Sequence, residues 1–467
     1  MERAGSSTFK AAQEAFPGAG RILVICGAGN NGGDGYIIAR LALEAGMGVV
    51  LCALKDPSGL QGDAALAASR WQDAGGIAQT WPLQGDVEFD LVFDALLGTG
   101  LDREPAGIFG AAVDFINAAG KPVVAVDIPS GLNADSGVVM GRAVKADLTV
   151  TFIGNKRGLY TADGPDQSGQ VVFSDLDTPR SVRDSEPEYG NLIRESMLKK
   201  WLPKRRRNSH KGSFGWVLCV GGNDGMSGAV RLAGEAALRG GAGKVTLATR
   251  AAHAALVNLT CPELMVRGVE EGTQLESVIN PVSVVVTGTG LGQTPWSEEM
   301  LRMCLQTRSP LVVDADGLNL LAMHRQNPPE APEAGWILTP HPAEAARLLG
   351  SGSREVQADR VGSALKLARE FNAVVVLKGC GTVIADAGGR YAICPFGNPG
   401  MASAGTGDVL AGVIGAMVAQ GLDPWFAAQA GVLAHALAGD CAAEETGERG
   451  MLASDLFRHL PAVVNSV

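Results

Sequence analysis

The sequence predicts an α/β protein built from open parallel sheets. Short, wholly apolar segments alternate with segments of helical spacing along most of the chain, a pattern typical of buried strands and their crossover helices. Many of the apolar segments end in glycine-rich loops, and nucleotide-type sheets hold their ligands at such strand ends. The 467 residues exceed what one hydrophobic core usually supports, so we expect two or three domains.

Composition excludes several classes of protein. Hydrophobic residues make up 46% of the chain and glycines number 63, which indicates a loop-rich globular protein rather than a disordered one. The net charge of −10 argues against general binding to nucleic acid or to a membrane surface. The eight cysteines form no CxxC pair, so they do not suggest a zinc site. Residues 1–10 lack the apolar stretch of a secretory leader, and we expect a soluble, cytoplasmic protein.

The first half of the chain opens with a strand, a glycine loop and a helix. Residues 21–26 predict a buried strand, residues 27–35 a loop and residues 36–45 a helix. This order is typical of the first crossover of a nucleotide-type domain. The loop differs from the dinucleotide-binding fingerprint, because Asn30-Asn31 and Asp34 add polar groups to it.

Carboxylates recur at the ends of the strands that follow. Further strands are predicted at 49–53, 91–93, 122–126 and 148–152. Asp94 and Asp127 directly follow two of them, so we expect them to converge with Asp34 on one crevice. A loop cap explains any one of these residues, but three at equivalent strand ends favour a ligand site. With Asn31 and Ser130, their oxygens could hold a hard cation.

The second half predicts another open α/β sheet. Its strands are expected at 214–220, 284–286, 311–313, 336–338 and 374–377, with a helix at 230–239. Loops rich in glycine or carboxylates follow these strands, so they should gather at one edge of the sheet. Lys378 begins one such loop, and a lysine followed by glycines on either side of Cys380 suits a nucleotide phosphate.

Residues 397–412 organise this second half. Gly405-Thr406-Gly407 precedes an apolar helix predicted at 409–419, and a glycine-lined helix N-terminus binds anions. Asp408 would repel a phosphate there unless it serves as a base on an incoming hydroxyl or acts through a metal, which is what phosphoryl transfer needs. The alternative is that Asp408 merely caps the helix.

A polar, charged stretch without periodicity at 181–190 marks the domain boundary. We assign the domains to residues 1–185 and 201–467, with a linker at 186–200. The basic run at 199–207 is interpreted as a solvated face or a local site for a polyanionic ligand, because the chain as a whole is acidic.

Two motifs of the first half resemble a known family. Asn30-Asn31-Gly32-Gly33-Asp34-Gly35 with Asp127-Ile128-Pro129-Ser130-Gly131 is similar to the epimerase domain of NAD(P)H-hydrate repair enzymes, which interconvert the C6 epimers of hydrated NAD(P)H. The resemblance implies a Rossmann-like three-layer sandwich, with Asp127 as acid or base at the reacting ring. It implies a potassium ion held by Asn31, Asp94 and Ser130. The substrate-binding residues that it implies are Asn30, Asn31, Gly32, Gly33, Asp34, Gly98, Thr99, Gly100, Leu101, Asp102, Arg103, Glu104 and Asp127.

Two further points come from this resemblance. Lys156 matches a family position, although a contact with a substrate phosphate would account for it equally well. The family usually has several dozen residues before the segment that residues 1–5 resemble, so we expect an N-terminally shortened epimerase domain.

The second half resembles the ribokinase superfamily through Gly407-Asp408. The fuller set of motifs is similar to the NAD(P)H-hydrate dehydratases over residues 202–460: His210-Lys211-Gly212, Asp314-Ala315-Asp316-Gly317, Thr339-Pro340-His341-Pro342 with Glu344, Lys378-Gly379 and Gly397-Asn398-Pro399-Gly400. Ala404 stands where a glycine is commoner, and we expect its added methyl to do little harm if its backbone angles are allowed.

This resemblance implies a ribokinase-like α/β sheet that uses ADP as phosphoryl donor with Mg²⁺. Asp408 would deprotonate the C6 hydroxyl of the hydrate, the phosphoryl group would transfer to it, and loss of phosphate would restore NAD(P)H. The implied substrate contacts are Ala229, Gly290, His341 and Asp408, and the implied ADP contacts are Lys378, Gly379, Cys380, Gly381, Thr382 and Gly407. His341 could orient the ring or merely cap a turn.

We therefore expect a bifunctional enzyme that epimerises the R and S hydrates and dehydrates the S form. Its partners would be hydrated NADH, hydrated NADPH and ADP, without nucleic acid or membrane, and we expect a homo-oligomer. The alternative is a ribokinase-type small-molecule kinase fused to a non-catalytic Rossmann-like binding module. A nicotinamide oxidoreductase fits less well, because the fingerprint loop is wrong.

Overall fold

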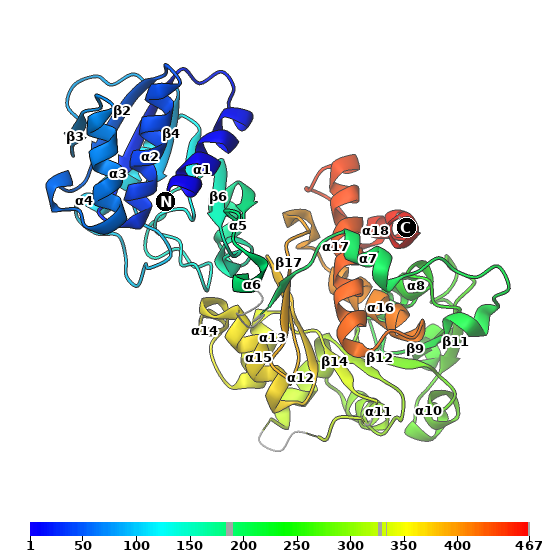
Figure 1. The fold of residues 1–467 in the computed structure, drawn as a ribbon. Coiled ribbons are helices and arrows are strands. Elements are labelled where there is room, and N and C mark those ends of the chain that lie inside the picture. Colours follow the sequence, from blue (N-terminus) through cyan, green and yellow to red (C-terminus); the bar gives the residue numbers. More distant parts are fainter. Residues whose placement is uncertain (184–189, 326–328, 333, 466–467) are drawn as a thin grey trace. The chain divides into compact units, whose positions relative to one another are not determined.

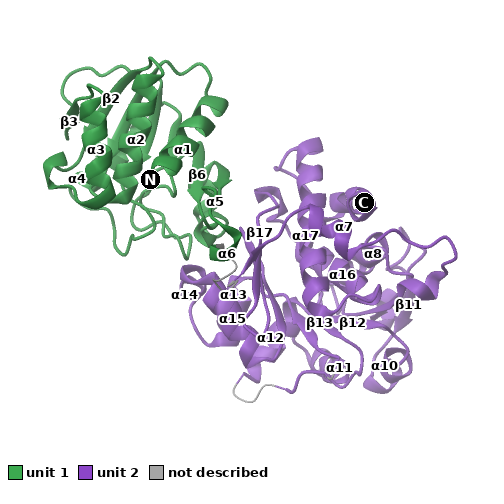
Figure 2. Cartoon of the chain, in the orientation of Figure 1, with its two compact units in different colours: residues 1–187 green, residues 188–467 purple. Residues whose placement is uncertain are grey.

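The computed structural model describes residues 1–183, 190–325, 329–332 and 334–465. The chain forms two compact units, Met1–Pro187 and Glu188–Val467 (Figure 2). Most of the expected boundary at 181–190 lies outside the described residues. The expected linker at 186–200 includes β8 (Asn191–Leu192) and α7 (Ser196–Trp201), which belong to the second unit. Of the helices that the structure describes, none has the length and apolar character needed to cross a bilayer.

The first unit contains a seven-stranded parallel sheet in the order β3-β2-β1-β4-β5-β6-β7 (Figure 1). Its strands are β1 (Arg21–Cys26), β2 (Gly48–Ala53), β3 (Ala78–Thr80), β4 (Leu91–Ala95), β5 (Val123–Val126), β6 (Leu148–Phe152) and β7 (Gln170–Ser174). The strand order reverses between β1 and β4, and open α/β sheets bind ligands at such a switch point. The sequence did not predict β3 and β7, because these edge strands are partly exposed and lack a continuous apolar run.

Helices cover both faces of this sheet. They are α1 (Glu2–Ala15), α2 (Asn30–Glu44), α3 (Gly62–Asp73), α4 (Ile108–Ala118), α5 (Gly164–Ser168) and α6 (Arg180–Arg183). One buried apolar cluster joins the sheet to α1, α2 and α3, and a second cluster joins its other face to α4. The resulting three layers confirm the predicted sandwich.

The glycine loop of the first unit is shorter than predicted. Helix α2 begins at Asn30, so the expectation of a loop through residue 35 is wrong. The glycines serve close packing instead: a Cβ on Gly32 would lie 2.0 Å from the carbonyl oxygen of Gly27, and one on Gly35 would lie 2.6 Å from Cys26 Sγ. Their lack of a side chain lets the first turns of α2 approach the sheet.

The second unit contains a ten-stranded mixed sheet in the order β11-β10-β9-β12-β13-β14-β15-β16-β17-β8. Its remaining strands are β9 (Trp216–Val220), β10 (Lys244–Thr249), β11 (Met265–Gly268), β12 (Val284–Thr287), β13 (Leu311–Val313), β14 (Trp336–Leu338), β15 (Val374–Leu377), β16 (Thr382–Ala385) and β17 (Tyr391–Cys394). Strand β9 starts two residues later than predicted, because Lys211–Phe214 forms a short 3₁₀ helix. The order reverses between β9 and β12, and β16 runs antiparallel to both of its neighbours.

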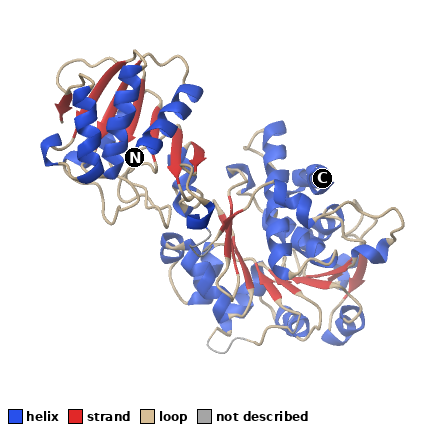
Figure 3. Ribbon diagram, viewed as in Figure 1, coloured by secondary structure: helices blue, strands red, loops and turns tan. Residues whose placement is uncertain are grey.

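Helices also cover this second sheet (Figure 3). They are α8 (Ser227–Arg239), α9 (Ala251–Ala254), α10 (Gly272–Ile279), α11 (Pro295–Leu305), α12 (Ala315–Met323), α13 (Pro342–Leu349), α14 (Ser353–Ala358), α15 (Arg360–Glu370), α16 (Thr406–Ala419), α17 (Pro424–Thr446) and α18 (Leu456–Asn465).

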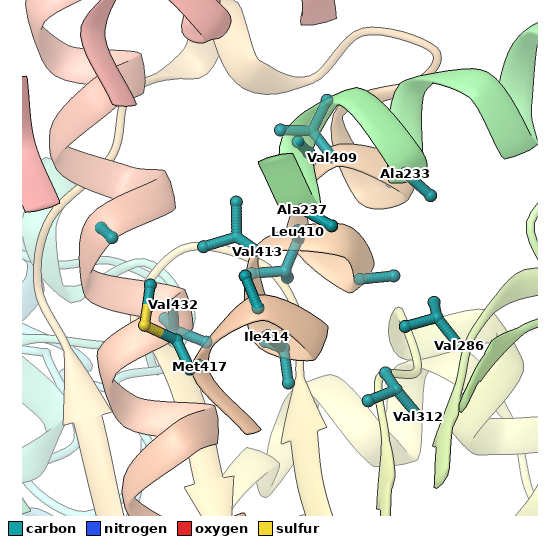
Figure 4. Packing of buried hydrophobic residues seen from close by; sticks show 14 of the residues in the cluster. Ala233, Ala237, Val286, Val312, Val409, Leu410, Val413, Ile414, Met417 and Val432 are labelled. Carbon is teal, nitrogen blue, oxygen red and sulfur yellow. The ribbon is translucent and has the colours of Figure 1, made fainter. Parts of the chain in front are cut away.

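Helix α16 is the centre of the second core. Every residue from Val409 to Ala419 is buried. In Figure 4 its side chains lie among Ala233 and Ala237 of α8, Val286 and Val312 of the sheet, and Val432 of α17. Each buried aliphatic side chain of this kind stabilises the fold by about 1.5–3 kcal/mol. The core therefore fixes the N-terminus of α16 firmly in place.

Candidate active sites

A hollow of about 820 Å³ lies at the switch point of the first unit. The N-terminus of α2 and the loop after β4 form its walls. The predicted residues that line it are Asn30, Asn31, Asp34, Gly98, Thr99, Gly100, Leu101, Asp102, Arg103, Glu104 and Asp127. The structure thus brings nearly all of the predicted epimerase residues to one place. Gly32 and Gly33 are buried in the packing of α2.

Asp127 follows β5 and forms an ion pair with Lys156. Its Oδ1 also accepts hydrogen bonds from the Phe152 amide at 3.1 Å and from Thr151 Oγ1 at 3.3 Å. Lys156 Nζ donates a second bond to the Phe152 carbonyl at 2.8 Å. Both charged side chains are more than four-fifths buried, at 18% and 16% exposed. The structure therefore places Lys156 directly beside Asp127.

A second hollow, of about 400 Å³, shares Asn30, Asp34, Thr99 and Asp127 with the first and adds Lys156. Asp34 Oδ1 is buried and has no hydrogen-bond partner among the described residues. Burial raises the pKa of Asp34 to about 7, and the charge of Asp127 adds to this shift. A carboxyl group that titrates near neutrality and stands beside an ion pair is suited to acid–base work.

Asp94 lies deeper, where it holds two loops together. Its Oδ1 accepts from Ser130 Oγ at 2.6 Å, and its Oδ2 accepts from the Ser130 amide at 2.8 Å. Ser130 Oγ in turn accepts from the Leu97 amide at 2.9 Å, and Asn31 Nδ2 donates to the Leu97 carbonyl at 3.1 Å. Burial raises the pKa of Asp94 to about 6, although the bonds from Ser130 oppose the shift. The predicted cation ligands therefore form one connected group rich in oxygen.

The second site surrounds the N-terminus of α16. Gly405 caps this helix with a φ of +94°, a left-handed conformation that glycine adopts without strain. Ala404 is outside that left-handed region, as the replacement of a glycine there requires. The buried His435 on α17 hydrogen-bonds the Thr406 carbonyl through Nε2 at 2.9 Å. Burial lowers the pKa of His435 to about 4, so the ring is neutral and its Nε2–H donates this bond.

Lys378 and Asp314 meet the helix end. Lys378 Nζ lies 2.6 Å from Asp314 Oδ1, and a Cβ on Gly407 would lie 3.3 Å from the same Nζ. Thr339 Oγ1 donates to Asp314 Oδ1 at 2.7 Å. Burial alone would lower the pKa of Lys378, but Asp314 and Glu344 outweigh it and raise the value. A fixed cation therefore stands beside glycine amides, which is an arrangement that holds phosphate.

Asp408 stands in the first turn of α16. Burial raises its pKa to about 7, the charge of Asp314 adds to the shift, and Lys378 opposes it. A general base works best when its pKa lies near the working pH. The geometry therefore suits Asp408 to accept a proton from a substrate hydroxyl beside the phosphate site.

Arg360 supports the loop from Lys378 to Thr382, which is predicted to bind ADP. This side chain on α15 is 1% exposed, and its Nη2 donates to the carbonyls of Leu377 and Lys378 at 3.2 Å. Gly379 and Gly381 have positive φ, and Thr382 Oγ1 donates to the Gly379 carbonyl at 3.0 Å. Arg360 could not be identified as a site residue from the sequence, because one arginine in a helix normally faces solvent.

His341 caps helix α13. Its Nδ1 accepts from the amides of Ala343 at 3.1 Å and Glu344 at 3.3 Å, and its Nε2 lies 3.3 Å from Glu344 Oε1. Burial lowers the pKa of His341, and the positive charges of Lys378 and Arg347 add to the shift. This cap is one of the two roles that the sequence left open for His341.

The other two residues predicted to contact the ring lie side by side. A Cβ on Gly290 would stand 2.9 Å from the Cβ of Ala229. Ala229 lies in the first turn of α8, and Gly290 in the loop after β12, so both flank the β9–β12 switch point. Ligands bind at this position in open α/β sheets.

Fold and sites together define a two-domain nucleotide-type α/β protein with a glycine–aspartate helix end in its second unit. Residues 217–462 match the family model described as NAD(P)H-hydrate dehydratase, and residues 1–158 match that of the YjeF-related protein N-terminus. A ribokinase-like superfamily protein from Enterococcus faecalis V583 superposes on 60% of this chain and 97% of its own length, with a TM-score of 0.55 and 28% identity. The second unit is thus ribokinase-like.

Full-length comparison is more specific. The chain is 46% identical over its whole length to the bifunctional NAD(P)H-hydrate repair enzyme Nnr of Coxiella burnetii, covering 94% of that protein. The ADP/ATP-dependent NAD(P)H-hydrate dehydratase from Bacillus subtilis, co-crystallized with ATP/Mg²⁺, matches 58% of this chain and 97% of its own, at 30% identity and a TM-score of 0.51. The chain belongs to the family of bifunctional NAD(P)H-hydrate repair enzymes.

Proposed function

We propose that this chain repairs hydrated NADH and NADPH through two activities. The first unit interconverts the R and S hydrates at C6, and the second unit dehydrates the S form at the expense of ADP. The observation that carries this proposal is the position of Asp408, a carboxyl group with a pKa of about 7, beside Lys378 and the glycine amides of α16. Membership of the family supports both halves of the proposal.

Dehydration needs a better leaving group than hydroxide. Asp408 accepts the proton of the C6 hydroxyl while that oxygen attacks the terminal phosphorus of ADP and the bond to AMP breaks. Lys378 and the amides at Gly405–Gly407 stabilise the charge on the migrating phosphoryl group. Departure of phosphate from C6 with loss of a proton from C5 then re-forms the ring double bond and restores the reduced nicotinamide. The products are AMP, inorganic phosphate and NAD(P)H.

A magnesium ion bound with the nucleotide would neutralise further phosphate charge. Among the described residues, no three His, Cys, Asp or Glu side chains cluster to hold a metal by themselves. Mg²⁺ commonly takes one or two carboxylates and completes its shell with phosphate oxygens and water. Asp314 fits this role, because its Oδ2 would lie 3.5 Å from a Cβ on Gly407, on the side of the phosphate site.

In the first unit, Asp127 and Lys156 would exchange protons with the ring, and the residues of the larger hollow would hold the dinucleotide. A potassium ion would be held by Asn31, Asp94 and Ser130, which contain amide, carboxylate and hydroxyl oxygens and are linked to one another through the loop after β4. The buried Asp94 would gain a counter-charge from such an ion, and the loops after β4 and β5 would be fixed by it.

The test is to incubate the protein with both epimers of hydrated NADH, with and without ADP, and to measure NADH, AMP and phosphate. We expect one AMP and one phosphate for every NADH restored, and only a change in epimer ratio when ADP is omitted. A stable phosphate ester without NADH would instead support the ribokinase-type kinase fused to a binding module. ATP is tested in parallel, because the Bacillus subtilis relative is described as ADP/ATP-dependent.

Two further expectations remain proposals. We propose a cytoplasmic location, where the substrates are made, and a homo-oligomeric assembly. Fractionation and light scattering of the purified chain test them.

A further inference from the structure

Two neighbouring strands of the first unit end in the same unusual turn. After β5, the Ile128 amide donates to the Val126 carbonyl at 2.8 Å, and after β6 the Gly154 amide donates to the Phe152 carbonyl at 2.6 Å. Each bond closes a three-residue γ-turn. The central residues, Asp127 and Ile153, have φ values of +66° and +64°. A γ-turn with positive φ at its centre is rare and strained.

The strain at Asp127 has an evident purpose, because that residue lies in both hollows. The strain at Ile153 is harder to explain by folding alone. A β-branched residue is poorly suited to positive φ, and glycine would adopt it freely. Ile153 is also 55% exposed, so burial of its side chain in the protein offsets little of the strain energy of its backbone. Strain that the fold does not need is found mainly at functional sites.

Ile153 lines the 400 Å³ hollow together with Asp127, Lys156 and Asp34. Its backbone is tied to the same network, because the Ile153 amide donates to the Ser174 carbonyl at 2.9 Å, and the preceding residue, Phe152, bonds to both Asp127 and Lys156. The other residues that line this hollow are both polar and apolar: Asn30, Asp34, Asp63, Thr99, Met1, Ala4, Phe152 and Leu176. Ile153 is the most exposed of the apolar residues, because Ala4 and Phe152 are buried and Met1 and Leu176 are partly buried, so its side chain offers an accessible apolar wall beside the reacting groups.

We propose that Ile153 contacts the hydrated nicotinamide ring and holds it against Asp127 and Lys156 during epimerisation. This inference rests on the proposed epimerase function. The ring of the hydrate carries a carboxamide and the C6 hydroxyl at its edge, but its faces are mostly carbon, so an aliphatic contact on one face fixes its orientation and keeps water from that face. The strained turn is what directs the side chain into the hollow.

The test uses substitutions that separate binding from folding. Ile153→Gly removes both the side chain and the strain, and Ile153→Asn keeps comparable size in a residue that accepts positive φ but is polar. We expect both variants to melt at or above the temperature of the wild type, while kcat/KM for conversion of pure R hydrate without ADP falls at least tenfold, mainly through KM. Ile153→Leu should retain most of the wild-type activity, because leucine keeps the apolar contact.

Two controls make the outcome decisive. Ile77→Asn changes another exposed isoleucine of the same unit, 82% exposed, and should leave epimerisation unchanged. ADP-dependent dehydration of pure S hydrate should be unchanged in every variant, because it occurs in the second unit. If Ile153→Gly and Ile153→Asn keep the wild-type kcat/KM, the role of Ile153 is overturned while the proposed epimerase function stands. The same holds if the lost activity is explained by a lowered melting temperature. An inactive wild-type first unit would overturn the proposed epimerase function and this inference with it.

Discussion

Replacing Asp408 by Asn should destroy dehydration and stabilise the protein at the same time. The wild-type carboxyl titrates at about 7 in the folded state, against an ordinary value of 3.8. At pH 8 it is ionised in both states, so its unfavourable surroundings cost up to roughly 4 kcal/mol, at about 1.4 kcal/mol for each unit between the two pKa values. Asn has almost the same shape and carries no charge, so the variant should recover much of that cost.

The sign of the pH dependence follows from the raised pKa. Between about pH 4 and pH 7 the folded state binds a proton that the unfolded state releases, so the wild type becomes less stable as pH rises through this range. The penalty at pH 5 is only roughly 2 kcal/mol by the same arithmetic. The advantage of Asp408→Asn should therefore shrink on acidification.

Calorimetry of the full chain at pH 8 and pH 5 measures this effect. The transition of the second unit is the one that ADP shifts, because a ligand stabilises only the unit that binds it. Asp423→Asn serves as a matched control, since Asp423 caps α17 through the Trp425 and Phe426 amides and Asn caps as well. Turnover should fall by about 10²–10⁴, the usual contribution of a general base. Substantial residual dehydration, or a variant less stable than wild type at pH 8, would refute the reasoning.

Four other outcomes are expected. Asp127→Asn should stop epimerisation and leave ADP-dependent dehydration of pure S hydrate intact; loss of both activities would contradict separate sites. Arg360→Lys should raise the Kd for ADP, measured by titration calorimetry, by about tenfold or more, because lysine cannot reproduce the bonds to the Leu377 and Lys378 carbonyls; an unchanged Kd would deny Arg360 its role under the loop. The kcat/KM of dehydration should rise with pH and level off above about pH 7, as Asp408 loses its proton, and a flat profile from pH 5 to pH 8 would exclude it as the base. Potassium should raise the melting temperature of the first unit more than lithium does, and Asp94→Asn should remove the difference; equal shifts would argue against a potassium site.

The main strands and the two glycine-rich ligand regions could be predicted because their signals are local. Wholly apolar runs such as residues 22–26 and 374–377 fit buried parallel strands, and Gly405-Thr406-Gly407 marks a helix end by its own chemistry. The edge strands β3 and β7 lacked this signal, since partly exposed strands carry mixed residues. The start of α2 was misjudged, because glycines suggest a loop when only the tertiary contact with the Gly27 carbonyl explains them.

Site residues, too, could be predicted where the signal is local in sequence and could not where it depends on the fold. Carboxylates that follow strands, such as Asp127 and Asp314, were visible from the sequence. Arg360 and His435 were not, because each lies within a helix and bonds backbone carbonyls that only the fold brings to it. The positive φ of Ile153 could not be predicted from the sequence either, since isoleucine is common in and next to strands.

The central claim is that the hydroxyl of the hydrate becomes a phosphate ester before it leaves. S hydrate labelled with ¹⁸O in its C6 hydroxyl is incubated with ADP and the Asp127→Asn variant in ordinary water, so that epimerisation does not disturb the label. The ¹⁸O content of the released inorganic phosphate is then measured by mass spectrometry. We predict one ¹⁸O atom in each phosphate; label in water with unlabelled phosphate would contradict phosphoryl transfer to the substrate.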